Sequence, residues 1–204
     1  MGPRECYLIA DLQIEGGRPA THRTTLPQNS RMDRFDAPWA LRLRSTTTIA
    51  SLALLALPFA FYAVQPEKGL LVPGIASVIG CMAIALGSLF IIRGYRLDAN
   101  GLHVERLAWA DRIPLDDLRA AWADHEATEK STRLFGNSGF FCIAGLFSNR
   151  KLGRYRAFAT DPVRAVVLDL SSRKVVVTPA DPWEFQAALR RLRPAAEIGT
   201  KPAS

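Results

Sequence analysis

Two long uncharged apolar segments dominate the pattern of hydrophobic and polar positions along this chain. The first covers residues 45–64 and the second residues 70–92, and neither contains Asp, Glu, Lys, Arg or His. As helices with a rise of about 1.5 Å per residue they extend roughly 30 and 34 Å, which matches the hydrocarbon core of a bilayer. The pattern therefore predicts two transmembrane helices.

The composition of these segments favours insertion into lipid. The first holds eight strongly apolar residues and the second twelve. Each contributes roughly 0.3 to 0.6 kcal/mol, and neither segment carries the central Arg that would cost about 2.5 to 3.5 kcal/mol. A pair of buried helices in a soluble core is one alternative, but such helices seldom lack a polar face for so long. A cleaved signal peptide is another, but the first segment starts some forty residues into the chain and a second span follows directly.

Flanking charge predicts how the two helices are oriented. Only residues 65–69 join them, so they form an antiparallel hairpin with both ends of the chain on one side. Seven arginines flank the outer ends and one lysine lies in the turn: Arg31, Arg34, Arg42, Arg44, Arg93, Arg96 and Arg106, against Lys68. This asymmetry predicts a multi-pass protein of the cell inner (plasma) membrane with both termini in the cytoplasm. The small-residue pairs Ala76 with Gly80 and Ala83 with Gly87 would allow close helix approach.

Polar segments lie at both ends of the chain. Residues 1–44 contain glycines, prolines and a Thr-rich stretch that interrupt any periodic pattern, so we expect a disordered tail and juxtamembrane segment. Residues 194–204 are expected to form a second disordered tail. Met1 and Met32 both stand as candidate start positions, because the stretch from Met32 to Arg44 would serve as a complete juxtamembrane start.

Beyond Ile92 the pattern changes to the alternation that is typical of β-strands. Asn100-Gly101 is a strong hairpin signal between two alternating segments, and a third strand is predicted from about Leu115 to Trp122. Residues 124–133 are polar and predict a loop. Further strands are expected at 140–147 and 154–159, followed by a final hairpin of 163–170 and 174–178.

The soluble part ends with an amphipathic helix. Asp181 is a suitable N-cap, Pro182 suits the first helical position and Glu184 follows as in a capping box. An apolar face then recurs at helical spacing through Phe185, Ala188, Leu189 and Leu192. About seven strands followed by one helix predict an all-β barrel with one end covered by that helix.

Charge and cysteine content exclude several classes of protein. The net charge of +7 arises from seven basic and five acidic residues before the spans and eighteen against thirteen after them. This modest, dispersed excess suits a surface near anionic lipid better than a nucleic-acid interface, which requires a denser basic stripe. Cys6, Cys81 and Cys142 lie in three different regions, so they build neither a disulfide framework nor a metal site.

Several short motifs follow one another in the second half of the chain: Tyr95-Arg96-Leu97, Asn100-Gly101-Leu102, Ile113-Pro114-Leu115, the Gly-rich stretch 133–145, and Thr178-Pro179 before Asp181-Pro182. Through these motifs residues 93–193 resemble the bacterial pleckstrin-homology (PH)-like families, several of which place transmembrane helices before a PH-like barrel. The resemblance implies a membrane α-helical hairpin followed by an all-β PH-like barrel capped by a C-terminal α-helix. It also implies protein contacts and a non-enzymatic role.

Four basic residues are the candidate contact site for an anionic lipid or a partner: Arg150, Lys151, Arg154 and Arg156. Lys151, Arg154 and Arg156 imitate the Lys-x-x-Arg-x-Arg pattern of phosphoinositide-binding PH domains. In those domains, however, the pattern resembles a clamp on the first two strands, where this chain offers only Arg96 and Arg106, so we do not expect specific phosphoinositide recognition. A looser contact with anionic headgroups, beside Phe140, Phe141 and Phe147, and an ordinary solvated loop both remain open. The three phenylalanines are more simply barrel core or rim residues.

Residues typical of enzymes are sparse. His125 is flanked by Asp124 and Glu126, but neighbouring residues on a loop point in different directions. The same holds for Asp116 and Asp117. His103 is expected to face solvent from its strand, and Cys142 lies between apolar residues as a buried thiol. We therefore predict no catalytic residue, cofactor, metal or specific small-molecule substrate.

Two functions remain open. The first is a membrane-anchored, non-enzymatic interaction or scaffold module whose partners are the lipid bilayer and another protein, with no role in nucleic-acid binding. The second is an accessory or sensor subunit of a membrane protein complex, acting through its transmembrane helices.

Overall fold

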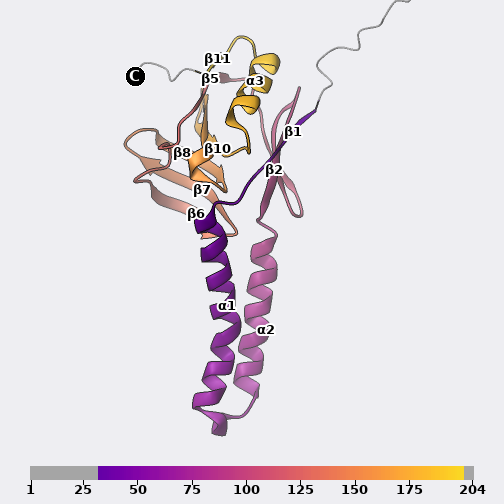
Figure 1. The fold of residues 1–204 in the computed structure, drawn as a ribbon, viewed down its shortest axis with the longest axis vertical. Coiled ribbons are helices and arrows are strands. Elements are labelled where there is room, and N and C mark those ends of the chain that lie inside the picture. Colours follow the sequence, from indigo (N-terminus) through magenta and orange to yellow (C-terminus); the bar gives the residue numbers. More distant parts are fainter. Residues whose placement is uncertain (1–31, 200–204) are drawn as a thin grey trace, which may run out of the picture.

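A helical hairpin and two facing β-sheets make up the protein, whose computed structural model describes residues 32–199 (Figure 1). Helix α1 (Leu41–Val64) and helix α2 (Leu71–Ser88) run antiparallel and are joined through the short 3-10 helix η2 (Pro66–Lys68). The predicted spans are therefore confirmed as helices, although α2 ends at Ser88 and Ile92 already belongs to a strand. Predictions about the start position, Cys6 and Arg31 concern residues outside the described range, except for Met32 itself.

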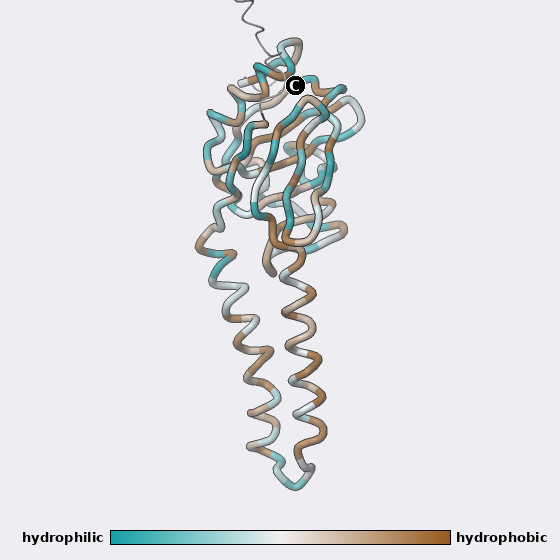
Figure 2. Tube along the Cα trace, turned by 90° about the vertical axis from the view of Figure 1, so that its right-hand side faces the viewer, coloured by the Kyte–Doolittle hydropathy of each residue, from teal (hydrophilic) through white to brown (hydrophobic). Residues whose placement is uncertain are grey.

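Both helices are long and apolar enough to cross a membrane. Only 11% of the most apolar window of each is buried, and Leu57, Phe59 and Ile79 are all more than 60% exposed. A core helix of a soluble protein would bury these side chains, so the structure disfavours that alternative. Figure 2 shows mostly brown, hydrophobic helices, with a hydrophilic turn at their far end.

The two small-residue pairs of α2 serve different purposes. Gly80 is buried against α1, where an added Cβ would lie 3.2 Å from the carbonyl oxygen of Leu54. Gly87 instead faces the β-sheet region, and an added Cβ there would come within 2.9 Å of the rings of Phe140 and Phe141. Gly80 thus allows close packing within the hairpin, whereas Gly87 allows the sheet region to dock on α2.

The first sheet is antiparallel and has four strands in the order β1-β2-β3-β4. They are β1 (Asp33–Asp36), β2 (Ile92–Asp98), β3 (Gly101–Arg106) and β4 (Ala110–Ile113). The predicted Asn100-Gly101 hairpin joins β2 to β3, pairs Leu97 with Leu102, and uses a positive φ at Gly101.

The second sheet has seven strands in the order β11-β5-β9-β10-β8-β7-β6. They are β5 (Leu118–Ala123), β6 (Thr132–Phe140), β7 (Cys142–Asn149), β8 (Gly153–Ala159), β9 (Val166–Leu170), β10 (Lys174–Val177) and β11 (Glu197–Ile198), with 3-10 helix η3 (Pro162–Arg164) before β9. Strand β6 forms one edge and crosses the end of α1 (Figure 1). The two sheets do not close into one continuous barrel, but the order of strands and the final helix agree with the predicted PH-like fold.

The main core lies between the two sheets and helix α3 (Pro182–Leu192). Phe185 of α3 packs edge-on against Phe35 at 5.2 Å and against Tyr95 at 6.5 Å. Asp181 caps α3 as predicted, because its Oδ1 accepts hydrogen bonds from the N–H groups of Trp183 and Glu184. A second cluster, which includes Trp122, Phe147 and Tyr155, covers the other face of the seven-stranded sheet.

Parts of both predicted tails belong to regular secondary structure. Residues 33–36 form β1, which pairs with β2 and places Phe35 in the core at 6% exposure, and residues 41–44 are the first turn of α1. At the other end, residues 197–198 form β11 beside β5, and Arg190 donates to the carbonyl oxygen of Ile198. Neither strand has a local periodic pattern, since each is held by partners far away in the sequence.

The strand predictions also need two changes. Strand β4 was not predicted, and Ile113 belongs to it and not to the third strand, which begins only at Leu118. The predicted loop 124–133 ends earlier, because β6 begins at Thr132 and its Gly-rich part is extended. Two bulges in the pairing of β6 with β7 disrupt the alternation that would identify this strand.

Candidate functional site

The four predicted basic residues do not form one free patch. Arg150 and Lys151 lie in the turn between β7 and β8, whereas Arg154 and Arg156 lie on β8, and all four are exposed. Lys151 Nζ forms ion pairs with Asp124 at 2.8 Å and Glu126 at 3.5 Å. The hydrogen bond to Asp124 is the main reason why the pKa of Lys151 is raised. Lys151 therefore stabilises the loop after β5, and because its charge is balanced by these carboxylates it is a poor binding group for an external anion.

Arg156 lies in a different setting from the other three. Its guanidinium carbon is 4.7 Å from the centroid of the Phe158 ring, and among the described residues it forms no ion pair. The register of β6, β7 and β8 places Phe135, Leu146 and Arg156 side by side across three strands. Arg156 therefore forms the cationic end of an otherwise apolar row.

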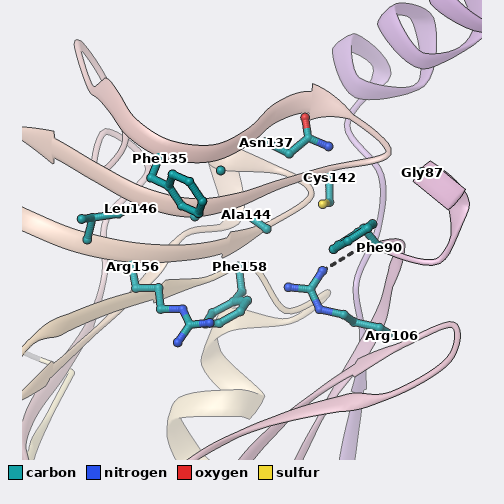
Figure 3. A pocket seen from close by; sticks show the side chains of 12 residues that line it. Gly87, Phe90, Arg106, Phe135, Asn137, Cys142, Ala144, Leu146, Arg156 and Phe158 are labelled. Atoms are coloured by element: carbon teal, nitrogen blue, oxygen red, sulfur yellow. Dashed lines mark hydrogen bonds between the residues drawn. The ribbon is translucent and has the colours of Figure 1, made fainter. Parts of the chain in front are cut away.

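This row lines an apolar groove of about 610 Å³ between the two sheets (Figure 3). One wall comes from β6, β7 and β8, and the other from Arg106 of β3 with Gly87 and Phe90 at the end of α2. The groove has few polar groups in a mostly apolar lining, which is typical of a binding site for a small or amphipathic ligand. Its lining residues are Gly87, Phe90, Arg106, Phe135, Gly136, Asn137, Cys142, Ala144, Gly145, Leu146, Arg156 and Phe158.

Arg106 connects the two sheets and α2 on the inner side of this groove. Its Nε donates to Asp111 Oδ2 at 2.8 Å and its Nη1 donates to the carbonyl oxygen of Phe90 at 2.8 Å. The guanidinium also lies 5.6 to 5.9 Å from the rings of Phe90, Trp109 and Phe158. Arg106 is only 9% exposed, so it is a structural cation whose charge Asp111 balances.

The turn between β6 and β7 docks onto both helices. The N–H of Phe141 donates to Thr47 Oγ1 of α1 at 3.0 Å, and Trp39 packs on the Phe141 ring at 6.4 Å. Phe140 and Phe141 also meet Gly87 of α2. The groove is therefore held directly beside the ends of the two candidate membrane spans.

A comparison with known families agrees with this architecture. Residues 93–193 match the sequence model of the family described as the bacterial PH domain. This half of the chain is a bacterial PH domain. The match begins at the second residue of β2 and ends directly after α3, so it covers both sheets except β1, β11 and Ile92. No curated protein matches the chain.

In lipid-binding PH domains the basic clamp lies on the first hairpin, which in this protein is formed by β2 and β3. The turn of this hairpin lies far from α1 and α2. Strand β2 starts four residues after α2 and ends at Asp98, so roughly 20 Å of strand separates its turn from the helix end. Arg96 on this hairpin lies 3.8 Å from Glu105, and Arg106 is balanced by Asp111. Neither residue of the first hairpin is therefore free to form such a clamp.

Phe140, Phe141 and Phe147 of the PH domain are packed as predicted. Phe147 is 4% exposed in the second core cluster, and Phe141 is 8% exposed against the helices. Phe140 is half-buried with its ring 4.4 Å from that of Phe141. They are core and rim residues of the domain.

The remaining polar candidates of the PH domain stay dispersed. His125 is exposed, Asp116 pairs with Arg193 at 3.0 Å, and Asp124 and Glu126 hold Lys151. Within residues 32–199 no group of three or more His, Cys, Asp or Glu side chains could hold a metal ion. His103 differs from the prediction, because its Nε2 lies 3.0 Å from Asp98 and the side chain is only 15% exposed.

Cys142 is a buried thiol, as predicted. It is 0% exposed at the start of β7, and burial raises the pKa of its thiol, so the reactive thiolate is disfavoured. The groove itself was not predicted, because its walls come from residues up to 71 positions apart, from Gly87 to Phe158. The sequence feature that could have indicated the groove is the apolar pair Leu134-Phe135 in a Gly-rich stretch.

Proposed function

We propose that the protein is a membrane-anchored, non-enzymatic interaction module. In this proposal the two helices cross the inner membrane, both termini are cytoplasmic, and the PH domain is held at the cytoplasmic surface. PH domains are typically interaction modules, so the domain would bind a protein or lipid at that surface. The observation that carries the proposal is the direct docking of the β6–β7 turn on Thr47 and Gly87.

Because of this docking, the domain is held directly on the helical hairpin and not through a flexible linker. Phe141 joins the domain to α1, while Phe90 and Trp109, whose rings are 5.2 Å apart, join it to the end of α2. Trp and other aromatic residues are favoured at membrane interfaces. Arg42, Arg44 and Arg93, which are exposed at the same ends of the helices, support the cytoplasmic orientation.

Cysteine labelling tests the orientation. In a background in which Cys6, Cys81 and Cys142 are changed to Ala, Glu67→Cys places a thiol in the turn between the helices, and Trp183→Cys places one on the exposed side of α3. We expect a membrane-impermeant maleimide to label Glu67→Cys in intact cells and Trp183→Cys only after the cells are broken. Labelling of Trp183→Cys in intact cells, or release of the chain into the supernatant without detergent, would contradict the proposal.

The alternative role, an accessory or sensor subunit acting through its helices, has less support. The small-residue pairs of α2 do not add to its support, because Gly80 packs within the hairpin and Gly87 packs on Phe140 and Phe141. Replacing α1 and α2 with an unrelated hairpin, while Thr47 and Gly87 are kept, separates the two roles. An interaction module keeps its partners after this exchange, whereas an accessory subunit loses them.

A further inference from the structure

We propose that the groove between the two sheets binds an anionic phospholipid of the adjoining leaflet. One acyl chain lies along Phe135 and Leu146, and the phosphate pairs with the guanidinium of Arg156. This inference rests on the proposed function, because it places the groove at the membrane surface. It also goes beyond it, since it names the ligand and the residues that select it.

The apolar wall of the groove is unusually exposed. Phe135 is 80% exposed and Leu146 is 40% exposed, and both belong to the same row across β6 and β7. Leu134, the neighbour of Phe135, is 48% exposed. Contiguous apolar side chains of this kind are costly to hydrate and mark a surface that an apolar partner covers.

The charge of the groove selects an anion. No acidic residue is among the described residues that line it, and Asp111 balances Arg106. Arg156 is exposed, stacks on Phe158 and pairs with no carboxylate of residues 32–199. An Arg guanidinium binds phosphate oxygens through paired N–H donors, so the free cation at the end of an apolar row fits a phosphate attached to an acyl chain.

The position of the groove favours a lipid over a free anion or a peptide. Gly87 and Phe90 line it at the end of α2, so in the proposed orientation it lies beside the bilayer. A phospholipid can place one chain there while the other stays in the membrane. A peptide would instead be expected to pair with edge strand β6, but the two bulges and the positive φ values at Gly136 and Gly139 interrupt that strand.

The experiment measures lipid bound to the full-length chain. The protein is purified in mild detergent and titrated with dioleoyl-phosphatidylglycerol, with dioleoyl-phosphatidylcholine, and with glycerophosphoglycerol, which has the headgroup but no chains. Bound lipid is counted by native mass spectrometry. We expect preferential binding of the phosphatidylglycerol, and no binding of the chain-free headgroup at the same concentration.

Matched variants locate the site. Arg156→Ala should weaken phosphatidylglycerol binding about fivefold, the effect of one basic residue at an anionic surface, whereas Arg154→Ala, two residues away on the same strand, should not. Leu146→Glu should weaken binding at least as much, and Val163→Glu, which is also exposed but is not among the residues that line the groove, should not. Because all four side chains are exposed or partly exposed, the unfolding temperature of each variant provides a check on folding.

Several results would overturn the lipid site. Equal losses of phosphatidylglycerol binding in Arg156→Ala and Arg154→Ala would show that general surface charge causes the binding. Unchanged binding in Leu146→Glu would show that the acyl chain does not lie in the groove. Binding of glycerophosphoglycerol that matches the lipid would indicate a free anion site. These failures leave the labelling pattern of Glu67→Cys and Trp183→Cys intact, so they are distinct from a failure of the proposed function.

Discussion

Single residues of the same type have opposite roles in this protein. Arg106 and Arg156 line one groove, but Arg106 is buried with Asp111 and the Phe90 carbonyl group, whereas Arg156 is exposed on Phe158. In the sequence, Arg106 is one of the charges that flank the spans and Arg156 is one of four neighbouring basic residues. The two arginines differ in role because the fold places a carboxylate and a carbonyl group beside Arg106 and an aromatic ring beside Arg156.

Tyr95 is a residue whose ionisation controls stability. Its hydroxyl donates to the carbonyl oxygen of Phe158 at 2.6 Å and accepts from the N–H of Thr178 at 3.1 Å, at the centre of the core. Burial raises the pKa of Tyr95 from 10.0 to about 12, although the hydrogen bonds with Thr178 act in the opposite direction. The unfolded chain therefore loses this proton at lower pH than the folded chain.

The predicted consequence is a loss of stability at alkaline pH. The contribution of Tyr95 is complete below pH 10 and decreases as the pH rises from 10 towards 12, by about 2 kcal/mol in the free energy of unfolding. Tyr95→Phe should remove this part of the decline, while it lowers stability at pH 8 by about 1 to 3 kcal/mol because two buried backbone groups lose a partner. Denaturant unfolding of the full chain in detergent measures both. Parallel pH profiles for the two proteins would show that Tyr95 does not titrate in this way.

At the scale of secondary-structure elements, the β6–β7 turn packs against α1 and the end of α2. The turn has Phe141 at a positive φ of 65°, held by Thr47, and Asn137 closes it through a hydrogen bond from Nδ2 to the Phe140 carbonyl oxygen. The absence of a side chain at Gly87 lets both rings approach the helix. This contact sets the position of the domain on the hairpin.

Gly87→Val should separate the turn from α2. The added Cβ would lie 2.9 Å from both rings, so they must move, and the hydrogen bond from Phe141 to Thr47 should weaken. We expect amide hydrogen exchange over residues 137–142 of the full chain to become about tenfold faster, which corresponds to about 1.4 kcal/mol of local stability.

Gly74→Val is the matched control for this change. Gly74 lies at the other end of α2, and an added Cβ there meets no atom within 4 Å. Exchange over residues 137–142 should stay at the wild-type rate in this variant. Equal rates in Gly87→Val and the wild type would show that the turn does not depend on contact with α2.

At the scale of the whole molecule, the helical hairpin projects from the end of the domain that the two sheets form (Figures 1 and 2). The exposed Arg42 and Arg44 lie in the first turn of α1 and the exposed Arg93 lies in β2, at the end of the hairpin next to the domain. Among the described residues these three form no ion pair, so changing them breaks no salt bridge of the fold. Their role is expected to be in choosing the orientation of the hairpin.

Exchanging this charge should invert the hairpin. Changing Arg42, Arg44 and Arg93 to Glu, together with Gln65→Lys and Glu67→Lys, transfers the basic excess to the turn. We expect more than half of the Trp183→Cys thiols to become accessible to the impermeant maleimide in intact cells. The control changes Arg154, Arg173 and Lys174, which are also exposed or partly exposed but lie in the seven-stranded sheet or its turn. In this control the thiol should stay protected. Full protection in the first variant would mean that these charges do not set the orientation.

The sequence alone determined the features that depend on neighbouring residues. The two helices, the Asn100-Gly101 hairpin and the Asp181 cap follow from hydropathy, turn chemistry and capping within a few residues, so the pattern of the chain was sufficient. The resemblance of residues 93–193 to PH-like families was likewise confirmed.

Tertiary structure decided what depends on distant partners. Strand β1 exists because Phe35 reaches Phe185, and the domain docks because Phe141 reaches Thr47, 94 residues away. Lys151 is engaged and Arg156 is free because of which carboxylates the fold brings near each of them. Local patterns report the surroundings of a residue along the chain, whereas these contacts arise from the packing of separate elements, which no local period encodes.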